Sequence, residues 1–143
     1  MNRIVILTLA FFLLQACNPQ SRGFNLPPGN AENGKSTFTR LGCNNCHRID
    51  SVVEWSGGNE EPPINIRLGG PTTRVKTYGD LVTSIIHPSH KISQSWKGEM
   101  KTEDGESRMR NYNDVLLVAD LIDLVEFLQS EYEIIIPDYY AYH

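Results

Sequence analysis

The chain has 143 residues, a length that suits one domain with a small hydrophobic core. Its 40% hydrophobic and 21% charged residues are typical of a globular protein, because a disordered chain has fewer apolar residues and a membrane protein has longer apolar runs. The formal net charge of -4 argues against nucleic acid and anionic lipid headgroups as main partners, since both bind to positive surfaces. The 3 cysteines are more informative, because each has its own sequence context.

Residues 1–16 have the pattern of an export signal. A short cationic start precedes the uncharged run Ile4–Leu14, which is too short for a membrane-spanning helix of about 20 residues. The run ends in Leu13-Leu14-Gln15-Ala16-Cys17, which resembles the lipobox of bacterial lipoproteins, where the cysteine is acylated. The resemblance implies a lipid anchor on Cys17, because two or three acyl chains hold a protein stably at a membrane. Ordinary cleavage after Ala16, which would leave a free thiol, is the alternative.

The rest of the chain divides by composition. Residues 17–30 contain several prolines and glycines, so a flexible spacer is expected behind the lipidated N-terminus. Residues 31–136 are predicted to form one folded domain, and residues 137–143 form a tyrosine-rich tail. The tail and the isoleucines before it are apolar enough to pack on the domain or on a partner.

The segment Cys43-Asn44-Asn45-Cys46-His47 has the C-x-x-C-H pattern of c-type haem attachment. In such a site the two thiols bond to the vinyl groups of haem, and the histidine binds the iron. Two other kinds of site share part of this pattern. A zinc site needs a second pair of ligands, which His87 and His90 could supply, and a thioredoxin-like redox pair needs a preceding strand. The sequence before Cys43 predicts a helix, so haem attachment is the preferred interpretation.

Around this motif, the chain resembles the class I cytochrome c family from about Ala31 to Tyr132. The first predicted helix starts after Asn30, a favourable N-terminal cap, and carries Gly34 and Phe38 on one side, as the family's first helix does. The resemblance implies an all-α fold, the class I cytochrome c fold, in which helices surround one covalently bound haem c. It also implies that the last helix crosses the first closely at Gly34.

In this family, a methionine ahead of the last helix provides the second iron ligand. Met109 fits this position, because Tyr112 follows it at the spacing of the family's Met-Pro-x-aromatic loop and an amphipathic helix is predicted over Val115–Ser130. The resemblance therefore implies that Met109 binds the iron. The chain departs from the family at two positions: Arg110 replaces proline, and Leu117 stands where serine or threonine usually caps the helix.

Other ligands stay open at this point. Met100 lies in a polar stretch without the following aromatic residue and helix, so a surface position is the simpler interpretation. His87 lies near the end of a helix predicted from Tyr78, where a histidine interacts with the negative end of the helix dipole. Ligation by His87 or His90 would give a bis-histidine haem, and an iron with no second protein ligand is a further alternative.

The resemblance implies further contacts around the haem. Gly69-Gly70-Pro71 follows the motif at about the distance of a Gly-Pro pair in the family, which implies that the Pro71 carbonyl accepts the proton of the outer nitrogen of His47. An ordinary turn is the alternative. The residues of the types that bind haem propionates in the family are Arg67, Arg74, Lys76, Tyr78 and Trp96.

The resemblance implies an electron-transfer protein rather than an enzyme, with haem c as its one covalent cofactor. With His47 and Met109 on the iron, no coordination position is free for a substrate, so one-electron transfer is the expected chemistry. The expected partners are a donor and an acceptor redox protein and, through the lipid anchor, the periplasmic side of a bacterial membrane; no nucleic acid is expected. The alternatives are a haem-based sensor or gas-binding cytochrome, and a dedicated cytochrome subunit of a larger redox enzyme.

Overall fold

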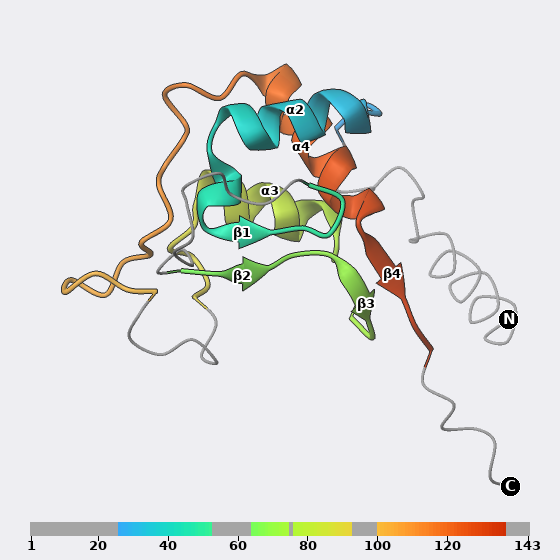
Figure 1. Cartoon of the computed structure of the whole chain (residues 1–143). Helices are drawn as coiled ribbons and strands as arrows, with labels where there is room; N and C mark the ends of the chain where they lie inside the picture. Colours follow the sequence, from blue (N-terminus) through green and yellow to red (C-terminus); the bar gives the residue numbers. More distant parts are fainter. Residues whose placement is uncertain (1–25, 53–63, 75, 93–99, 137–143) are drawn as a thin grey trace, which may run out of the picture.

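The computed structural model describes residues 26–52, 64–74, 76–92 and 100–136. The predicted export signal, Cys17 and the tail after residue 136 lie outside the described residues. The described residues form three α-helices, one 3₁₀-helix and four short strands (Figure 1). In chain order, the elements are α2 (Ala31–Arg40), the 3₁₀-helix (Cys43–Asn45), β1 (His47–Arg48), β2 (Ile66–Arg67), β3 (Gly70–Thr72), α3 (Tyr78–Ile86), α4 (Val118–Ser130) and β4 (Tyr132–Ile134).

The strands form two separate parallel sheets of two strands each. β1 pairs with β2, with His47 opposite Ile66, and β3 pairs with β4, with Pro71 opposite Glu133. The predicted all-α fold is therefore wrong, because the described part of the chain mixes helices with parallel strand pairs. Each strand has only two or three residues, which is too short to show the alternating pattern by which a strand is recognised in a sequence.

Helices α2 and α4 cross at Gly34, and their backbones come into contact there (Figure 1). A Cβ atom at Gly34 would lie 2.6 Å from the Cβ atom of Phe127 and still closer to the backbone oxygen of Asp123. Only glycine, which has no side chain, permits so close an approach of two helices. The predicted close crossing of the first and last helices is thus confirmed.

Polar contacts hold both ends of α2 against α4. Asn30 caps α2 as predicted, since its side chain accepts a hydrogen bond from the N–H of Asn33 at 3.0 Å. The N–H of Asn30 also donates to the carboxylate of Asp123 at 2.8 Å, and Arg40 forms a salt bridge with Asp120 at 2.9 Å at the other end. Exposed pairs of this kind contribute at most about 1 kcal/mol each, so the packing at Gly34 has to provide most of the stability of the crossing.

The helix predicted from Tyr78 is present as α3 and is held at its start by a capping box. The hydroxyl of Thr77 accepts from the N–H of Asp80 at 3.1 Å, and the carboxylate of Asp80 accepts from the N–H of Thr77 at 3.4 Å. The hydrogen bonds from Thr77 lower the pKa of Asp80, because they stabilise its charged form. The helix buries Val82 and Ile85 in the core that it shares with α4.

Helix α4 begins at Val118 instead of the predicted Val115. The N–H groups of Val115 and Leu116 both donate to the carbonyl of Tyr112, at 2.9 and 2.8 Å, and so close a turn before the helix starts. Leu117 then occupies the N-cap position without a side-chain hydrogen bond and is 68% exposed. The apolar side chain of Leu117 has no atom that can accept a hydrogen bond from the free N–H groups of the first turn. This agrees with the sequence analysis, in which Leu117 replaces the serine or threonine cap of the similar family.

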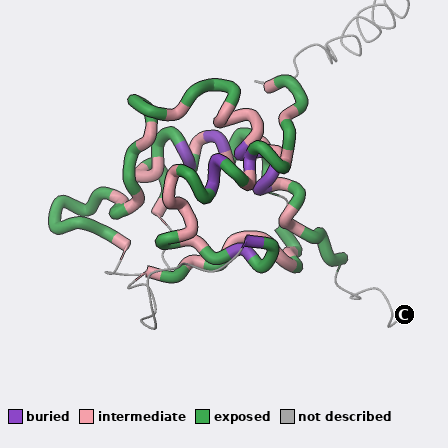
Figure 2. The backbone as a smooth tube through the Cα atoms, turned by 45° about the horizontal axis from the view of Figure 1, so that its top comes forward, coloured by how far each residue is buried: buried purple, intermediate pink, exposed green. Residues whose placement is uncertain are grey.

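The hydrophobic core lies between the helices and the segment around β1 (Figure 2). Phe38 of α2 and Phe127 of α4 meet edge to face with ring centroids 5.8 Å apart, a preferred aromatic geometry. Ile49 and Val52, which follow β1, add a second side to this core. Leu26, within the predicted spacer, also packs against it. Among the described helices, none combines the length and the apolarity needed to cross a membrane.

The substitution Gly34→Ala is expected to lower the free energy of unfolding by roughly 3 kcal/mol, because the added methyl group overlaps α4 at a backbone that cannot move without separating the helices. Gly79→Ala is the matched control, since a Cβ atom there meets nothing within 4 Å and alanine is the better helix former. Denaturant unfolding of both variants measures the difference. Equal stability of the two variants would contradict the close crossing.

Candidate functional site

The haem-attachment motif forms a tight reversal at the end of α2. Leu41 is the C-terminal cap of α2, and Gly42 adopts a left-handed conformation with a φ of 71°, which glycine favours. The N–H of Cys46 then donates to the carbonyl of Cys43 at 3.2 Å, which closes the 3₁₀ turn. This reversal directs the chain back along the helices, with Cys43 partly buried and Cys46 exposed.

A largely apolar cavity adjoins this reversal and is bounded by α2, α3 and α4. Its volume is about 180 Å³, and the empty space that includes the open mouth measures about 850 Å³. Phe38 and Leu124 contribute to its apolar wall. Cys43, His47 and Met109 all line it, although Met109 is distant from the motif in the sequence. The fold thus brings together three of the residues that the sequence predicts around a haem.

His47 is held in the cavity wall by the pairing of β1 with β2. The N–H of Ile66 donates to the carbonyl of Cys46 at 2.8 Å, and the N–H of Leu68 donates to the carbonyl of Arg48 at 2.9 Å, so backbone bonds flank the histidine on both sides. Nδ1 of His47 is buried and has no hydrogen-bond partner. Burial lowers the pKa of His47, an effect that the Ile66 backbone partly opposes. The imidazole is therefore neutral at pH 7, the form that binds a metal.

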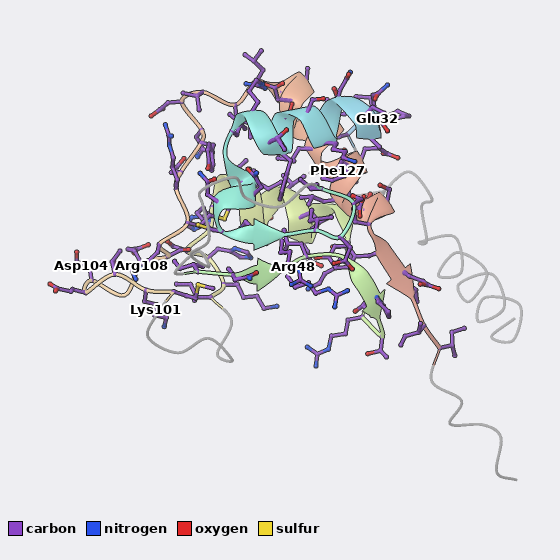
Figure 3. All side chains as sticks on the ribbon, in the orientation of Figure 1. Glu32, Arg48, Lys101, Asp104, Arg108 and Phe127 are labelled. Carbon is purple, nitrogen blue, oxygen red and sulfur yellow. The ribbon has the colours of Figure 1, made fainter. Side chains whose placement is uncertain are left out.

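Met109 reaches the cavity from the end of a short hairpin that starts at Met100. The N–H of Arg108 donates to the carbonyl of Met100 at 2.9 Å, and Lys101 forms an antiparallel bridge with Ser107. Figure 3 shows Lys101 and Arg108 on this hairpin, at a distance from the helices. The two methionines therefore occupy adjacent positions at its base, but only Met109 lines the cavity. This placement favours Met109 over Met100 as an iron ligand.

The loop after Met109 is fixed by an aromatic residue. Tyr112 lines the cavity, and its hydroxyl donates to the carbonyl of Leu41 at 3.2 Å. The guanidinium of Arg110 lies 5.3 Å from the centre of the Tyr112 ring, within the range of a cation–π contact. Burial raises the pKa of Tyr112, and the neighbouring Cys43 raises it further, so the hydroxyl remains protonated and able to donate.

The two other histidines in the described residues lie away from the cavity. His87 and His90 are exposed, and neither contributes to the cavity wall. Nδ1 of His90 lies 3.0 Å from the carbonyl of His87, which stabilises the turn after α3. The two rings thus interact locally, and their placement does not favour the bis-histidine alternative.

Pro71 is exposed in β3 and does not line the cavity. The predicted contact between its carbonyl and His47 is not formed, because Nδ1 of His47 has no hydrogen-bond partner. The strand pairing gives the reason: His47 is paired with Ile66 in one sheet, whereas Pro71 is paired with Glu133 in the other. The alternative prediction, an ordinary turn at Gly70-Pro71, did not include the pairing of β3 with β4 either. The sequence around Pro71 contains no local pattern that indicates this pairing.

The zinc and dithiol interpretations find little support in this geometry. The described residues contain no group of three or more histidine, cysteine, aspartate or glutamate side chains that could hold a metal ion, whereas structural zinc needs four convergent ligands. Burial raises the pKa of the Cys43 thiol to about 11, while a redox-active thiol has a lowered pKa. Helix α2, and not a strand, precedes the motif.

A further set of polar residues in the cavity wall lies along one side of α3 and just before this helix, namely Lys76, Asp80 and Ser84. Among the propionate candidates in the described residues, only Lys76 lines the cavity. The other candidates are placed elsewhere: Arg67 forms an ion pair with Asp50 at 2.6 Å, Arg74 is exposed, Tyr78 has a buried hydroxyl without a partner, and Trp96 lies outside the described residues.

Several residues of the cavity wall were not identified from the sequence, among them Leu68 and Tyr132. Leu68 follows β2, and Tyr132 begins β4, and both line the cavity. Their positions depend on parallel pairing between distant segments, for which the sequence contains no local signal. Leu81 was also missed, although its spacing of four residues from Ile85 on the predicted helix is a usable signal.

Comparison of the chain with protein-family models, with curated proteins and with solved structures gave no match. The function is therefore inferred from the motif and from the geometry of the cavity.

Proposed function

We propose that the chain is a one-electron carrier that binds one haem c covalently through Cys43 and Cys46, with His47 and Met109 as iron ligands. The observation that carries this proposal is the meeting of Cys43, His47 and Met109 in the wall of one apolar cavity. Haem bound there would supply reversible one-electron chemistry at its iron.

The residues of the cavity are suited to such a cofactor. The neutral imidazole of His47 and the thioether of Met109 can both bind iron without first losing a proton. Cys43 lies in the cavity wall, and Cys46, at the end of the same 3₁₀ turn, is exposed, so a haem attached to both thiols would have one edge near the surface.

Ligation by both residues has a functional consequence. With His47 and Met109 bound, small molecules can reach the iron only by displacing the thioether. The soft thioether and the apolar wall, to which Phe38 and Leu124 contribute, both favour the reduced state, so a relatively high reduction potential is expected. The protein's contributions are ligation, exclusion of water and a surface for donor and acceptor proteins.

A haem-based sensor is the second candidate, and one observation favours it. No side chain caps the start of α4, since the apolar side chain of Leu117 makes no hydrogen bond at the N-cap position. A weakly held helix start next to the Met109 loop would allow the thioether to leave the iron and a gas to enter. The two candidates differ in whether the reduced protein binds carbon monoxide.

The deciding experiment is performed on the purified, haem-loaded protein. We expect a reversible one-electron redox titration, the thioether–iron absorption near the red end of the oxidised spectrum, and no binding of carbon monoxide to the reduced form. Met109→Ala should abolish this band, lower the reduction potential and allow carbon monoxide to bind, because it removes the ligand that favours ferrous iron. Met100→Ala is the matched control from the other end of the same hairpin and should retain the band.

Rapid binding of carbon monoxide by the unsubstituted, reduced protein would favour the sensor. Loss of the band in Met100→Ala with retention in Met109→Ala would show that the ligand is assigned to the wrong end of the hairpin.

We further propose that the protein is held at the periplasmic side of a bacterial membrane by acyl chains on Cys17, which lies outside the described residues. The argument comes from the lipobox-like sequence that ends at Cys17. The mature protein should partition into detergent, and Cys17→Ser should release it to the soluble fraction without a change in its visible spectrum. A native protein that begins with an unmodified Cys17 and stays soluble would contradict the anchor.

A further inference from the structure

Tyr112 connects the two segments that carry the proposed iron ligands. Its hydroxyl donates to the carbonyl of Leu41 at 3.2 Å, across 71 positions of the sequence. Leu41 stands two residues before Cys43, at the start of the reversal that places the attachment motif. Tyr112 itself stands three residues after Met109 and lines the same cavity. This hydrogen bond therefore joins the methionine loop to the motif segment.

Arg110 restrains the ring that makes this bond. Its guanidinium lies 5.3 Å from the centre of the Tyr112 ring. Arg110 also directly follows Met109, at the position where the similar family has proline. A proline would restrain the backbone by its fixed φ angle. Arg110 cannot do this, but its contact with the ring restrains the same turn through side chains.

The far side of the loop is fixed by Asn113. Its side-chain amide donates to the carbonyl of Ile86 at the end of α3 at 2.9 Å, and its backbone N–H donates to the side-chain oxygen of Asn111 at 2.9 Å. The carbonyl of Tyr112 receives the N–H bonds of the turn that leads into α4. Tyr112 is thus the point at which the loop is tied to the motif, while Asn113 ties it to α3.

We propose that Tyr112 is a positioning residue for the iron ligand: its bond to Leu41, with Arg110 packed on its ring, keeps Met109 in the cavity wall. This inference rests on the proposed function, since it assigns a role toward the same cofactor. It explains how the loop is held in a chain that lacks both the proline and a capped start of α4. It also predicts that the loop opens, and the iron becomes accessible, when the bond to Leu41 is removed.

The test uses Tyr112→Phe in the haem-loaded protein, a change that removes only the hydroxyl. The measurements are the thioether–iron band of the oxidised form, the rate of carbon monoxide binding to the reduced form, and hydrogen exchange of the amides between Met109 and Leu116. Because one hydrogen bond is lost, the binding rate and the exchange rates are expected to rise about fivefold. Tyr78→Phe is the control, since it removes a buried hydroxyl that has no partner and lies outside the cavity wall.

A second pair of variants tests Arg110, which is exposed and can be replaced with little risk to folding. Arg110→Gln should weaken the thioether–iron band and raise the rate of carbon monoxide binding, as Tyr112→Phe does. Arg110→Lys keeps a cation that can lie over the ring, so it should restore most of the band.

The outcomes separate the two proposals. Unchanged rates in Tyr112→Phe, or equal changes in Tyr78→Phe, would overturn the positioning role while the native band still supports ligation by Met109. Absence of the band from the unsubstituted protein would overturn both the positioning role and ligation by Met109.

Discussion

The close contact between α2 and α4 at Gly34 is the constraint on which the rest of the structure depends. Because the two backbones touch, Phe38 and Phe127 are brought edge to face, and residues of both helices, Phe38 and Leu124 among them, line the cavity. The attachment motif follows the end of α2, and the methionine loop leads into the start of α4, so the crossing also fixes the positions of the two segments that carry the proposed iron ligands. The cavity between them is a consequence of this packing, which leaves space beside α3 that the side chains do not fill.

Different local interactions then fix the residues on the two sides of the cavity. The left-handed Gly42 and the pairing of β1 with β2 hold Cys43 and His47, whereas a hairpin and the Tyr112 bond hold Met109. Such preorganisation suits the proposed electron carrier, because iron ligands that stay in place in both oxidation states keep the structural rearrangement between these states small. Burial also favours metal binding, because it lowers the pKa of His47 and so keeps the imidazole in the neutral form that can bind a metal.

Local chemistry in the sequence predicted much of this arrangement. The cap at Asn30, the small residue at Gly34 and the helix from Tyr78 follow from short-range rules, and all three are present. The spacing of Met109 from the predicted last helix also selected the methionine that the cavity contains. The all-α expectation and the Pro71 contact were wrong because both concern segments whose partners are set by parallel pairing of two- or three-residue strands. Such pairings depend on tertiary packing, and strands this short contain no hydrophobic periodicity from which they could be predicted.

The most direct test of the account is the mass of one proteolytic peptide. Cleavage after Arg40 and Arg48 by trypsin releases the segment from Leu41 to Arg48, which contains the whole attachment motif. In protein isolated from a host that exports and attaches haem c, this peptide should carry the mass of one haem, and a variant that lacks both cysteines should not. A peptide from the native protein with two free thiols, or with Cys43 and Cys46 joined as a disulfide, would contradict the assignment of a covalent haem.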